Sequence, residues 1–514
     1  MSVTYYFIET EKENEPKPKV SPVRKALPQI IAVSVKNVLL FAFGMTLGFP
    51  TILIPSFSDS KSGERITLDQ DAISWISSVN LLCVPLGCLL SGVITQPLGR
   101  RRAMQLVNIP FLAAWLLFHY ATEPWHVFLA LCITGFSGGL LEAPVLTYVA
   151  EITEPSIRGA LSSTSTLAIN TGILTSYFLG TFLKWRNIAL INATIPFVSF
   201  ILLTLIAPES PYWLISKNRL AEAKKSLAWL RGWTTECNIE EEFNRIAENL
   251  ENNPMTKKWM GKGALIEQLK LYLKPTFLKP FALIIFCFCI GNFGNTPVAV
   301  YSVNIFASFG VSINPYTGTL CLGMAQLLAV LTCVLLIKFL GKRWLVIISL
   351  TGVIITFFAT ALYTFLNKVE YIQDVTKQSN MGVTSWIPLC SVIASAYFSY
   401  LCIKAIPWIL IGELFNNDIR SIAAGVSAAI GYVFGFVANK TFLNIIQLVG
   451  FSGVFWVYSC VAAGGLVALY FVLPETEGKT LEEIFDHYAG RGKLDNRVCR
   501  VTRLKNSSNG IEMT

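Results

Sequence analysis

The chain has 514 residues, of which 53% are apolar and only 14% charged, and its net charge is +9. Soluble proteins carry about 25% charged residues, so a soluble fold of this length would lack the polar side chains to cover its surface. The composition therefore argues against a soluble enzyme and indicates an all-α integral membrane protein.

Hydrophobic runs along the chain predict twelve transmembrane helices, because about 20 apolar residues are needed to cross a bilayer. Six runs precede a long polar insert and six follow it. The predicted spans are residues 30–55, 73–95, 103–120, 125–150, 160–183, 187–207, 279–306, 317–340, 344–366, 386–412, 421–446 and 453–473.

The Lys and Arg residues indicate which side of the membrane each connection faces, since cytosolic loops are enriched in them. One set of connections, which includes both termini, carries 32 of them, and the opposite set carries six. Both termini are therefore predicted to be cytosolic. The predicted regions are a tail (1–29), a six-helix half (30–207), a cytosolic central loop (208–278), a second half (279–473) and a tail (474–514).

The central loop contains a stretch that predicts a short amphipathic helix at the cytosolic surface. In Arg219–Leu230, three leucines (Leu220, Leu227 and Leu230) fall on one helical face.

The two halves repeat three features at the cytosolic ends of corresponding spans. A glycine followed by basic residues comes after spans 2 and 8, a glutamate seven residues before an arginine ends spans 4 and 10, and a proline–glutamate pair follows spans 6 and 12. The residues are Gly99, Arg100, Arg101, Glu151, Arg158 and Glu209 in the first half, and Gly341, Lys342, Arg343, Glu413, Arg420 and Glu475 in the second. Parallel repeats of this kind indicate a transporter whose two halves rock about an axis normal to the membrane.

The repeated charges predict ion-pair networks between helices of one half, which would hold the cytosolic side closed in one state and separate in the other. Carboxylates near the membrane interior are costly unless they are paired, which favours this interpretation. The alternative is that these residues only anchor helix ends at the headgroups and enforce topology.

Several longer motifs carry a resemblance to a known family. They are the Gly99-Arg100-Arg101 turn, Y-V-A-E-I-x-x-x-x-I-R-G-A at 148–160, P-E-S-P-Y-W-L at 208–214, P-W-I-L-I-G-E-L-F at 407–415 and P-E-T-E-G-K-T-L-E-E-I at 474–484. With these motifs, residues 30–485 resemble the sugar porter branch of the major facilitator superfamily, and are most similar to insect facilitative trehalose and glucose transporters. The resemblance implies alternating access, with a monosaccharide or disaccharide bound between the halves.

The chain departs from this family where amide side chains usually bind sugar. Those positions align with Thr166, Ile290, Gly291, Thr296, Gln326 and Gly431, and Tyr432 stands where tryptophan is usual. The family's tryptophan in span 10 is kept as Trp408. Proton-coupled relatives tend to carry an aspartate at the position of Ala42, so its absence favours uniport. Glu142 keeps proton coupling open.

Two charges inside the spans, Glu142 and Lys404, occupy equivalent places in the repeat, nine residues before Glu151 and Glu413. We hypothesise that they form an ion pair that gates the cavity or binds a polar substrate. Alternatively, each packs against its own surroundings and the two never meet. The other candidate ligand contacts are Thr166, Asn170, Asn295, Thr296, Gln326 and Trp408, each of which could instead be an interhelical packing residue.

The sequence gives little support for nucleotide hydrolysis, metal binding or catalysis. Gly478-Lys479-Thr480 lacks the earlier glycine of a phosphate-binding loop, and three scattered histidines cannot build a metal site. We therefore expect no catalytic residues, no metal, no cofactor and no nucleic-acid partner. The prediction is a plasma-membrane facilitator of a small sugar that functions as a monomer. A transporter of a non-sugar polar or charged solute, and a transport-silent nutrient sensor, are the alternatives.

Overall fold

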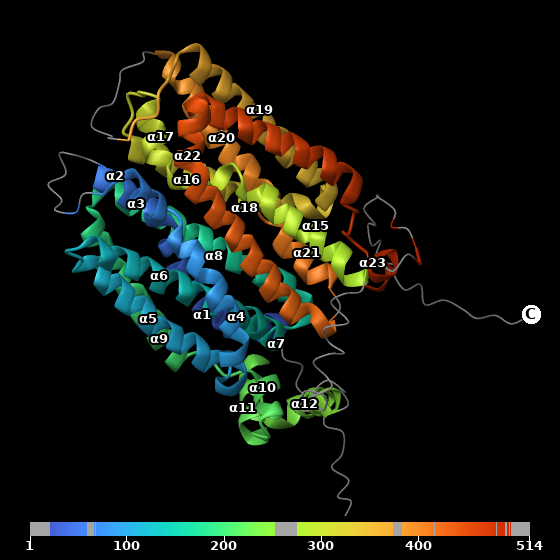
Figure 1. Cartoon of the computed structure of the whole chain (residues 1–514). Coiled ribbons are helices and arrows are strands. Elements are labelled where there is room, and N and C mark those ends of the chain that lie inside the picture. The colour runs from blue at the N-terminus through green and yellow to red at the C-terminus, as the bar shows by residue number, and fades with distance from the viewer. Residues whose placement is uncertain are drawn as a thin grey trace, which may run out of the picture.

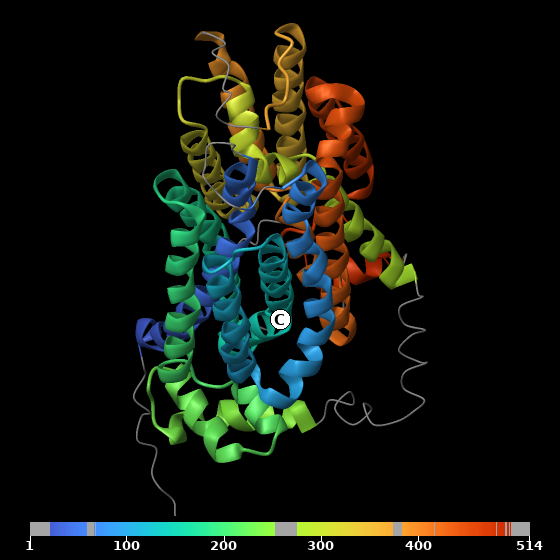
Figure 2. The same cartoon turned by 60° about the vertical axis from the view of Figure 1, so that its left-hand side comes forward.

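The computed structural model describes residues 21–58, 66, 68–251, 275–373, 383–415, 417–479, 481–488, 491, 492 and 494. The regular elements in these residues are helices. They form two bundles that lie side by side, one coloured blue to green and the other yellow to red (Figures 1 and 2).

The first bundle is built by the N-terminal part of the chain. Its helices are α1 (Pro22–Gly48), α2 (Pro50–Ser58), α3 (Gln70–Ile76), α4 (Val79–Leu98), α5 (Arg100–His119), α6 (Pro124–Leu140), α7 (Glu142–Ile152), α8 (Pro155–Phe182) and α9 (Trp185–Leu205). Three further helices follow, α10 (Pro211–Ser216), α11 (Leu220–Leu230) and α12 (Glu236–Glu251). They lie at one end of this bundle, which we call the inner end (Figure 1).

The second bundle repeats the pattern. Its helices are α15 (Pro275–Asn292), α16 (Asn295–Val300), α17 (Ser302–Ser308), α18 (Pro315–Leu340), α19 (Lys342–Leu366), α20 (Trp386–Leu401), α21 (Ile406–Leu414) and α22 (Asn417–Val472), with the 3-10 turn Val383–Ser385 before α20 and α23 (Leu481–Tyr488) after α22.

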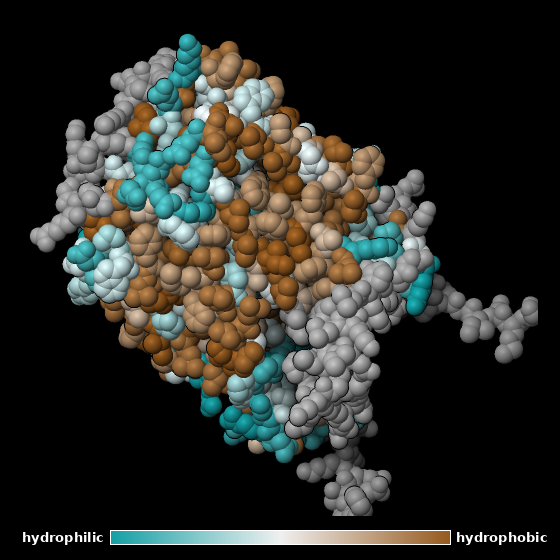
Figure 3. All heavy atoms as spheres, viewed as in Figure 1, coloured by the Kyte–Doolittle hydropathy of each residue, from teal (hydrophilic) through white to brown (hydrophobic). Residues whose placement is uncertain are grey.

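Nine helical stretches within the described residues are long and apolar enough to cross a membrane, by length and composition. One of them, the 50 residues Ala423–Val472, contains Gly450 with φ 79° and ψ 169°, where the helix turns back on itself. Dividing it there and counting α5 and α8 would bring the number to the predicted twelve. Apolar side chains cover the flank of the bundle, as a lipid-facing surface requires (Figure 3).

The structure breaks the spans that the sequence presented as continuous. Span 4 is divided between α6 and α7 at Leu141, span 7 between α15 and α16 at Gly294, and span 10 between α20 and α21 at residues 402–405. Gly294 has φ +111°, which an L side chain rarely adopts. Interrupted helices release backbone polar groups, and inside a membrane these are tolerated only where protein or a water-filled cavity surrounds them.

The predicted amphipathic helix is present as α11, and two of its three leucines are buried. Leu227 is 1% exposed and Leu230 is fully buried, whereas Leu220 is 44% exposed. Leu220 is the first residue of α11 and lies beyond the edge of the small core that α10, α11 and α12 share.

Helices within the first half approach so closely that only glycine fits at their crossings. A Cβ placed on Gly44 of α1 would lie 2.1 Å from the carbonyl oxygen of Ile169 on α8, and one on Gly172 would lie 2.2 Å from that of Phe41. Small residues that permit such backbone contact are the usual basis of helix association in membranes. The α1–α8 crossing therefore depends on Gly44 and Gly172.

We predict that Gly44→Leu lowers the free energy of unfolding by about 1–3 kcal/mol, the usual cost of an overpacked interface. Gly464→Leu is the matched control, because nothing lies within 4 Å of a Cβ at that position. The measurement is the thermal midpoint of the detergent-solubilised protein. Equal midpoints for the two variants would contradict the proposed crossing.

Candidate functional site

A charged network ties together helix ends at the inner end of the first half. Arg100 at the start of α5 donates from Nη2 to Glu151 Oε1 at 2.7 Å, and from Nε to the same oxygen at 3.2 Å. Ser210 donates its hydroxyl to the other carboxylate oxygen of Glu151. The side chains of Arg100 and Glu151 are 9% and 17% exposed, so the pair is largely shielded from water.

Glu209 caps the N-terminus of α5 in the same network. Its Oε1 accepts the backbone N–H groups of Arg100 (2.9 Å), Arg101 (3.0 Å) and Ser210 (3.0 Å). Carboxylates are stabilised at helix N-termini, where unpaired N–H groups and the helix dipole converge. Gly99, with φ +94°, makes the turn before α5, and a Cβ there would lie 2.5 Å from Glu209 Oε2.

The second half repeats the main contacts of this arrangement, with a lysine in place of Arg100. Lys342 at the start of α19 donates to Glu413 at 2.7 and 2.9 Å, and Thr476 donates to the same carboxylate at 2.8 Å. Glu475 accepts the backbone N–H groups of Lys342 (3.1 Å) and Arg343 (3.0 Å). The turn before α19 is Gly341, with φ +79°. Apart from Arg158 and Arg420, the predicted residues of each set therefore come together within their own half.

The arginines of the Glu-x6-Arg motif are placed differently. Glu151 pairs with Arg100, while Arg158 donates from Nη2 to the carbonyl oxygen of Thr153 at 3.1 Å. Arg420 lies in α22, and its side chain is outside the described residues.

Three network members were not among the predicted site residues. Ser210 and Thr476 directly follow the capping glutamates, so the recurrence of a hydroxyl there was the signal that could have identified them. Glu477 pairs with Lys342 at 2.8 Å. It has no counterpart in the first half, where the residue two positions after Glu209 is Pro211.

A second polar cluster lies further from the inner end, at the end of α15 and the break between α20 and α21. Lys404, in the break between α20 and α21, donates to Thr296 Oγ1 and, at 3.1 Å, to Asn292 Oδ1. Asn292 is the last residue of α15 and in turn donates from Nδ2 to the carbonyl oxygen of Gly431 at 3.1 Å. We refer to Lys404, Asn292 and Thr296 as the lysine cluster.

Glu142 begins α7 in the other half, and its partner is Tyr432 of α22, whose hydroxyl donates to Oε1 at 3.2 Å. The predicted ion pair between Glu142 and Lys404 is thus not formed in the described structure. Each charge instead has a neutral partner, and each partner is on a helix of the second half. This Glu142–Tyr432 contact joins the two halves about 13 Å from the level of Glu151, at 1.5 Å per residue.

Trp408 lies four residues after Lys404, and its indole ring packs beside Tyr432, the partner of Glu142. Its ring contacts Phe288 edge-on at 5.1 Å between centroids and Tyr432 at 6.1 Å, and it is 39% exposed. Aromatic rings together with a few placed polar groups are typical of a small-molecule site.

The remaining candidates lie outside this cluster. Asn295 is 3% exposed and donates to the Ser395 carbonyl at 3.2 Å, so it joins α16 to α20. Asn170 donates to the Thr166 carbonyl within α8 at 2.8 Å, and the residue Thr166 is exposed. Gln326 on α18 is 1% exposed, and its amide nitrogen has no hydrogen-bond partner in the described structure.

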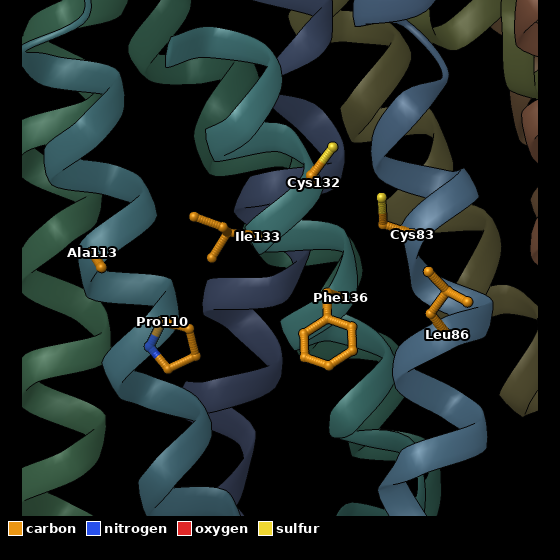
Figure 4. Close-up of a pocket in the computed structure, with 7 residues that line it drawn as sticks. All are labelled: Cys83, Leu86, Pro110, Ala113, Cys132, Ile133 and Phe136. Carbon is orange, nitrogen blue, oxygen red and sulfur yellow. The ribbon is translucent and has the colours of Figure 1, made fainter. Parts of the chain in front are cut away.

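An apolar groove lies on the flank of the first half, away from this site. Its volume is about 390 Å³, and it opens between α4, α5 and α6 (Figure 4). The lining residues are Cys83, Leu86, Pro110, Ala113, Cys132, Ile133 and Phe136. These side chains offer a sugar no strong hydrogen-bonding group. Within the described ranges, no three His, Cys, Asp or Glu residues are grouped to hold a metal ion.

Comparison with known proteins identifies the family. A family described as "Sugar (and other) transporter" matches residues 27–488. The chain belongs to this sugar transporter family. Among its relatives, the facilitated trehalose transporter Tret1 of Apis mellifera ligustica is 31% identical over 95% of this chain and 92% of its own. The Tret1 of Bombyx mori is 32% identical over 87% of this chain and 86% of its own.

Solved structures of sugar porters share the fold of this chain. The proton:xylose symporter XylE bound to 6-bromo-6-deoxy-D-glucose, a member of the major facilitator superfamily, aligns with a TM-score of 0.66 at 19% identity, covering 90% of this chain and 98% of XylE. A partially occluded inward-open form of the E. coli xylose transporter aligns at 0.67, covering 88% and 99%. The all-α major facilitator fold and the multi-pass membrane character predicted from the sequence are confirmed.

We predict that Glu475→Ala lowers the free energy of unfolding by about 1–3 kcal/mol, because it leaves two N–H groups at the start of α19 without their acceptor in a buried site. Glu475 itself is fully buried. Glu222→Ala is the control, since Glu222 forms a more exposed pair with Arg219 at 2.5 Å. The measurement is the thermal midpoint in detergent, and a midpoint equal to that of the control would contradict the capping role.

Proposed function

We propose that this protein is a facilitative transporter of a small sugar of the trehalose or glucose class, which it moves down its gradient by alternating access. Membership of the sugar transporter family over nearly the whole chain is the observation that carries this proposal. The two trehalose-transporting relatives support the substrate class, and they cover most of both chains.

The lysine cluster, Glu142, Tyr432 and Trp408 are the proposed sugar contacts. Sugar hydroxyls need convergent donors and acceptors beside an apolar face, and these six residues include an ammonium, a carboxylate, a phenol and an indole ring. Four of these residues stand at or next to helix breaks or helix ends, and Tyr432 reaches Glu142 from the opposite half. Thr166, Asn170, Asn295 and Gln326 remain candidate contacts for other steps of the cycle.

The inner networks of Glu151 and Glu413 are both formed here, and we propose that at the cytosolic gate they brace the helix ends of each half while the halves rock, instead of separating when the gate opens. The described cross-half hydrogen bonds run from the end opposite α10–α12 to the level of Glu142. This distribution supports a state that is open toward the inner end. We propose plasma-membrane placement with both termini and α10–α12 in the cytosol, and function as a monomer.

Uptake of labelled trehalose and glucose into cells that express the chain is the direct test of the proposed function. We expect saturable uptake of at least one sugar that is unaffected by a protonophore. Glu413→Gln should reduce it about tenfold, since a charge-assisted hydrogen bond of about 1.5 kcal/mol is weakened. Protein at the cell surface with no uptake of either sugar would overturn the substrate class, and screening would then move to charged solutes.

The proposed sugar-binding role of Lys404 and Glu142 is tested by substitutions away from the inner networks. We expect Lys404→Met to raise the KM for the transported sugar about tenfold, because an ammonium that donates up to three hydrogen bonds is replaced by an apolar side chain. Glu142→Gln keeps an acceptor for the Tyr432 hydroxyl and should have the smaller effect. Unchanged transport kinetics in both variants would remove these residues from the site.

A further inference from the structure

Lys440 of α22 makes a group of contacts that the proposed sugar site does not use. Its Nζ lies 2.7 Å from Asp71 Oδ1 and donates to Ser74 Oγ at 2.7 Å. The same ammonium sits 4.3 Å from the centroid of the Trp75 ring. Asp71, Ser74 and Trp75 all belong to α3 of the first half, so a single cation engages an acid, a hydroxyl and an aromatic face across the boundary between the halves.

Neighbouring residues extend this contact along both helices. Asn439 donates to the Ser77 carbonyl at 2.8 Å, and Gln447 donates to Gln70 Oε1 at 3.0 Å. Ser77 also accepts the hydroxyl of Tyr301 at 2.8 Å. Lys440 and Gln447 are two helical turns apart on α22, and Gln70 and Ser74 are one turn apart on α3, so two helix faces meet.

This contact lies at the outer end of the bundle, which is the end opposite α10–α12. Residues 70–76 precede α4, whose other end at Leu98 leads into the inner network at Gly99 and Arg100. Twenty residues of α4 separate the two places, about 30 Å at 1.5 Å per residue. If the two halves rock about a central site, a contact that joins them at one end must break when that end opens.

The energetics suit a contact that forms and breaks during each cycle. The Lys440 side chain is 20% exposed and that of Asp71 is 74% exposed, so water can solvate the acid when the pair separates. An ion pair with one exposed partner contributes modestly, and the cation–π contact adds a comparable amount. A fully buried pair would instead leave an uncompensated charge on opening, which is strongly unfavourable.

We propose that Lys440, Asp71, Ser74 and Trp75 form an outer latch that sets the balance between the two states of the transporter. The latch is formed while the outer end is closed and is released when it opens. It does not bind substrate. This inference rests on the alternating-access part of the proposed function and not on the identity of the sugar.

The test measures how often the outer end opens. Thr51 of α2 is fully buried and donates to the carbonyl oxygen of Ala299 in the other half at 3.4 Å, so a cysteine at this position becomes reactive only when the halves part. In a Thr51→Cys background, we expect Lys440→Met and Asp71→Asn each to raise the rate of labelling by a polar maleimide about threefold, the effect of losing a partly exposed pair. The double variant should label no faster than the faster single variant, since both substitutions break the same contact.

Controls separate a latch from general loosening. The charge-swapped variant Asp71→Lys with Lys440→Asp should return labelling toward the starting rate, whereas Glu222→Gln, in the ion pair with Arg219 that lies within one half, should not change it. Labelling is measured in intact and in permeabilised cells, so that Cys at position 51 is reached from either side of the membrane. Labelling of the chain without Thr51→Cys gives the background from native cysteines, which is subtracted. Equal labelling rates in all variants, or additive effects of the two single substitutions, would overturn the latch. Because labelling needs no sugar, a failed sugar assay leaves this result independent.

Discussion

Backbone polar groups in hydrocarbon must all be paired, and this constraint decides both the fold and the position of its polar residues. It is met by long helices through most of the chain, and the exceptions occur at helix ends and breaks. Glu209 and Glu475 accept the free N–H groups at the start of α5 and α19. The same glutamates are held beside the pairs Arg100–Glu151 and Lys342–Glu413, so the need to cap a helix and the need to pair a charge are satisfied in one place in each half.

The polar residues of the central cluster follow from the same constraint. Glu142 is the first residue of α7, Asn292 is the last of α15, and Lys404 lies between α20 and α21. A span that stops and restarts exposes carbonyl and N–H groups to the space between the halves, and polar side chains at these points face the same space. The interruptions thus explain why three spans that the sequence presents as apolar carry polar groups where they break.

The internal repeat of the sequence identified some of the polar site residues but not the contacts that they make. The network residues could be identified because charge is rare in the spans and each motif occurs twice. Asn292 could not, because a single amide in an apolar run gives no sign of its partner, and its contact with Lys404 depends on how α15 is rotated. The pairing of Glu142 with Lys404 was expected from equal depth in the repeat. Depth fixes the position of a residue along the membrane normal but not the direction in which its side chain points, and the hydrogen-bond partner of Glu142 is the Tyr432 hydroxyl.

The glycine crossing of α1 and α8 limits which side chains the first half can accept. Where Gly44 and Gly172 bring backbones into contact, any larger side chain separates two helices, so the interior of the first half resists substitution. The outer contacts between the halves are made by side chains instead, as in the pair of Lys440 with Asp71, so a substitution there changes the contact without separating two backbones. In related chains, the speed of the cycle and its response to temperature can therefore diverge through a few substitutions at the boundary, while the two bundles keep their shape.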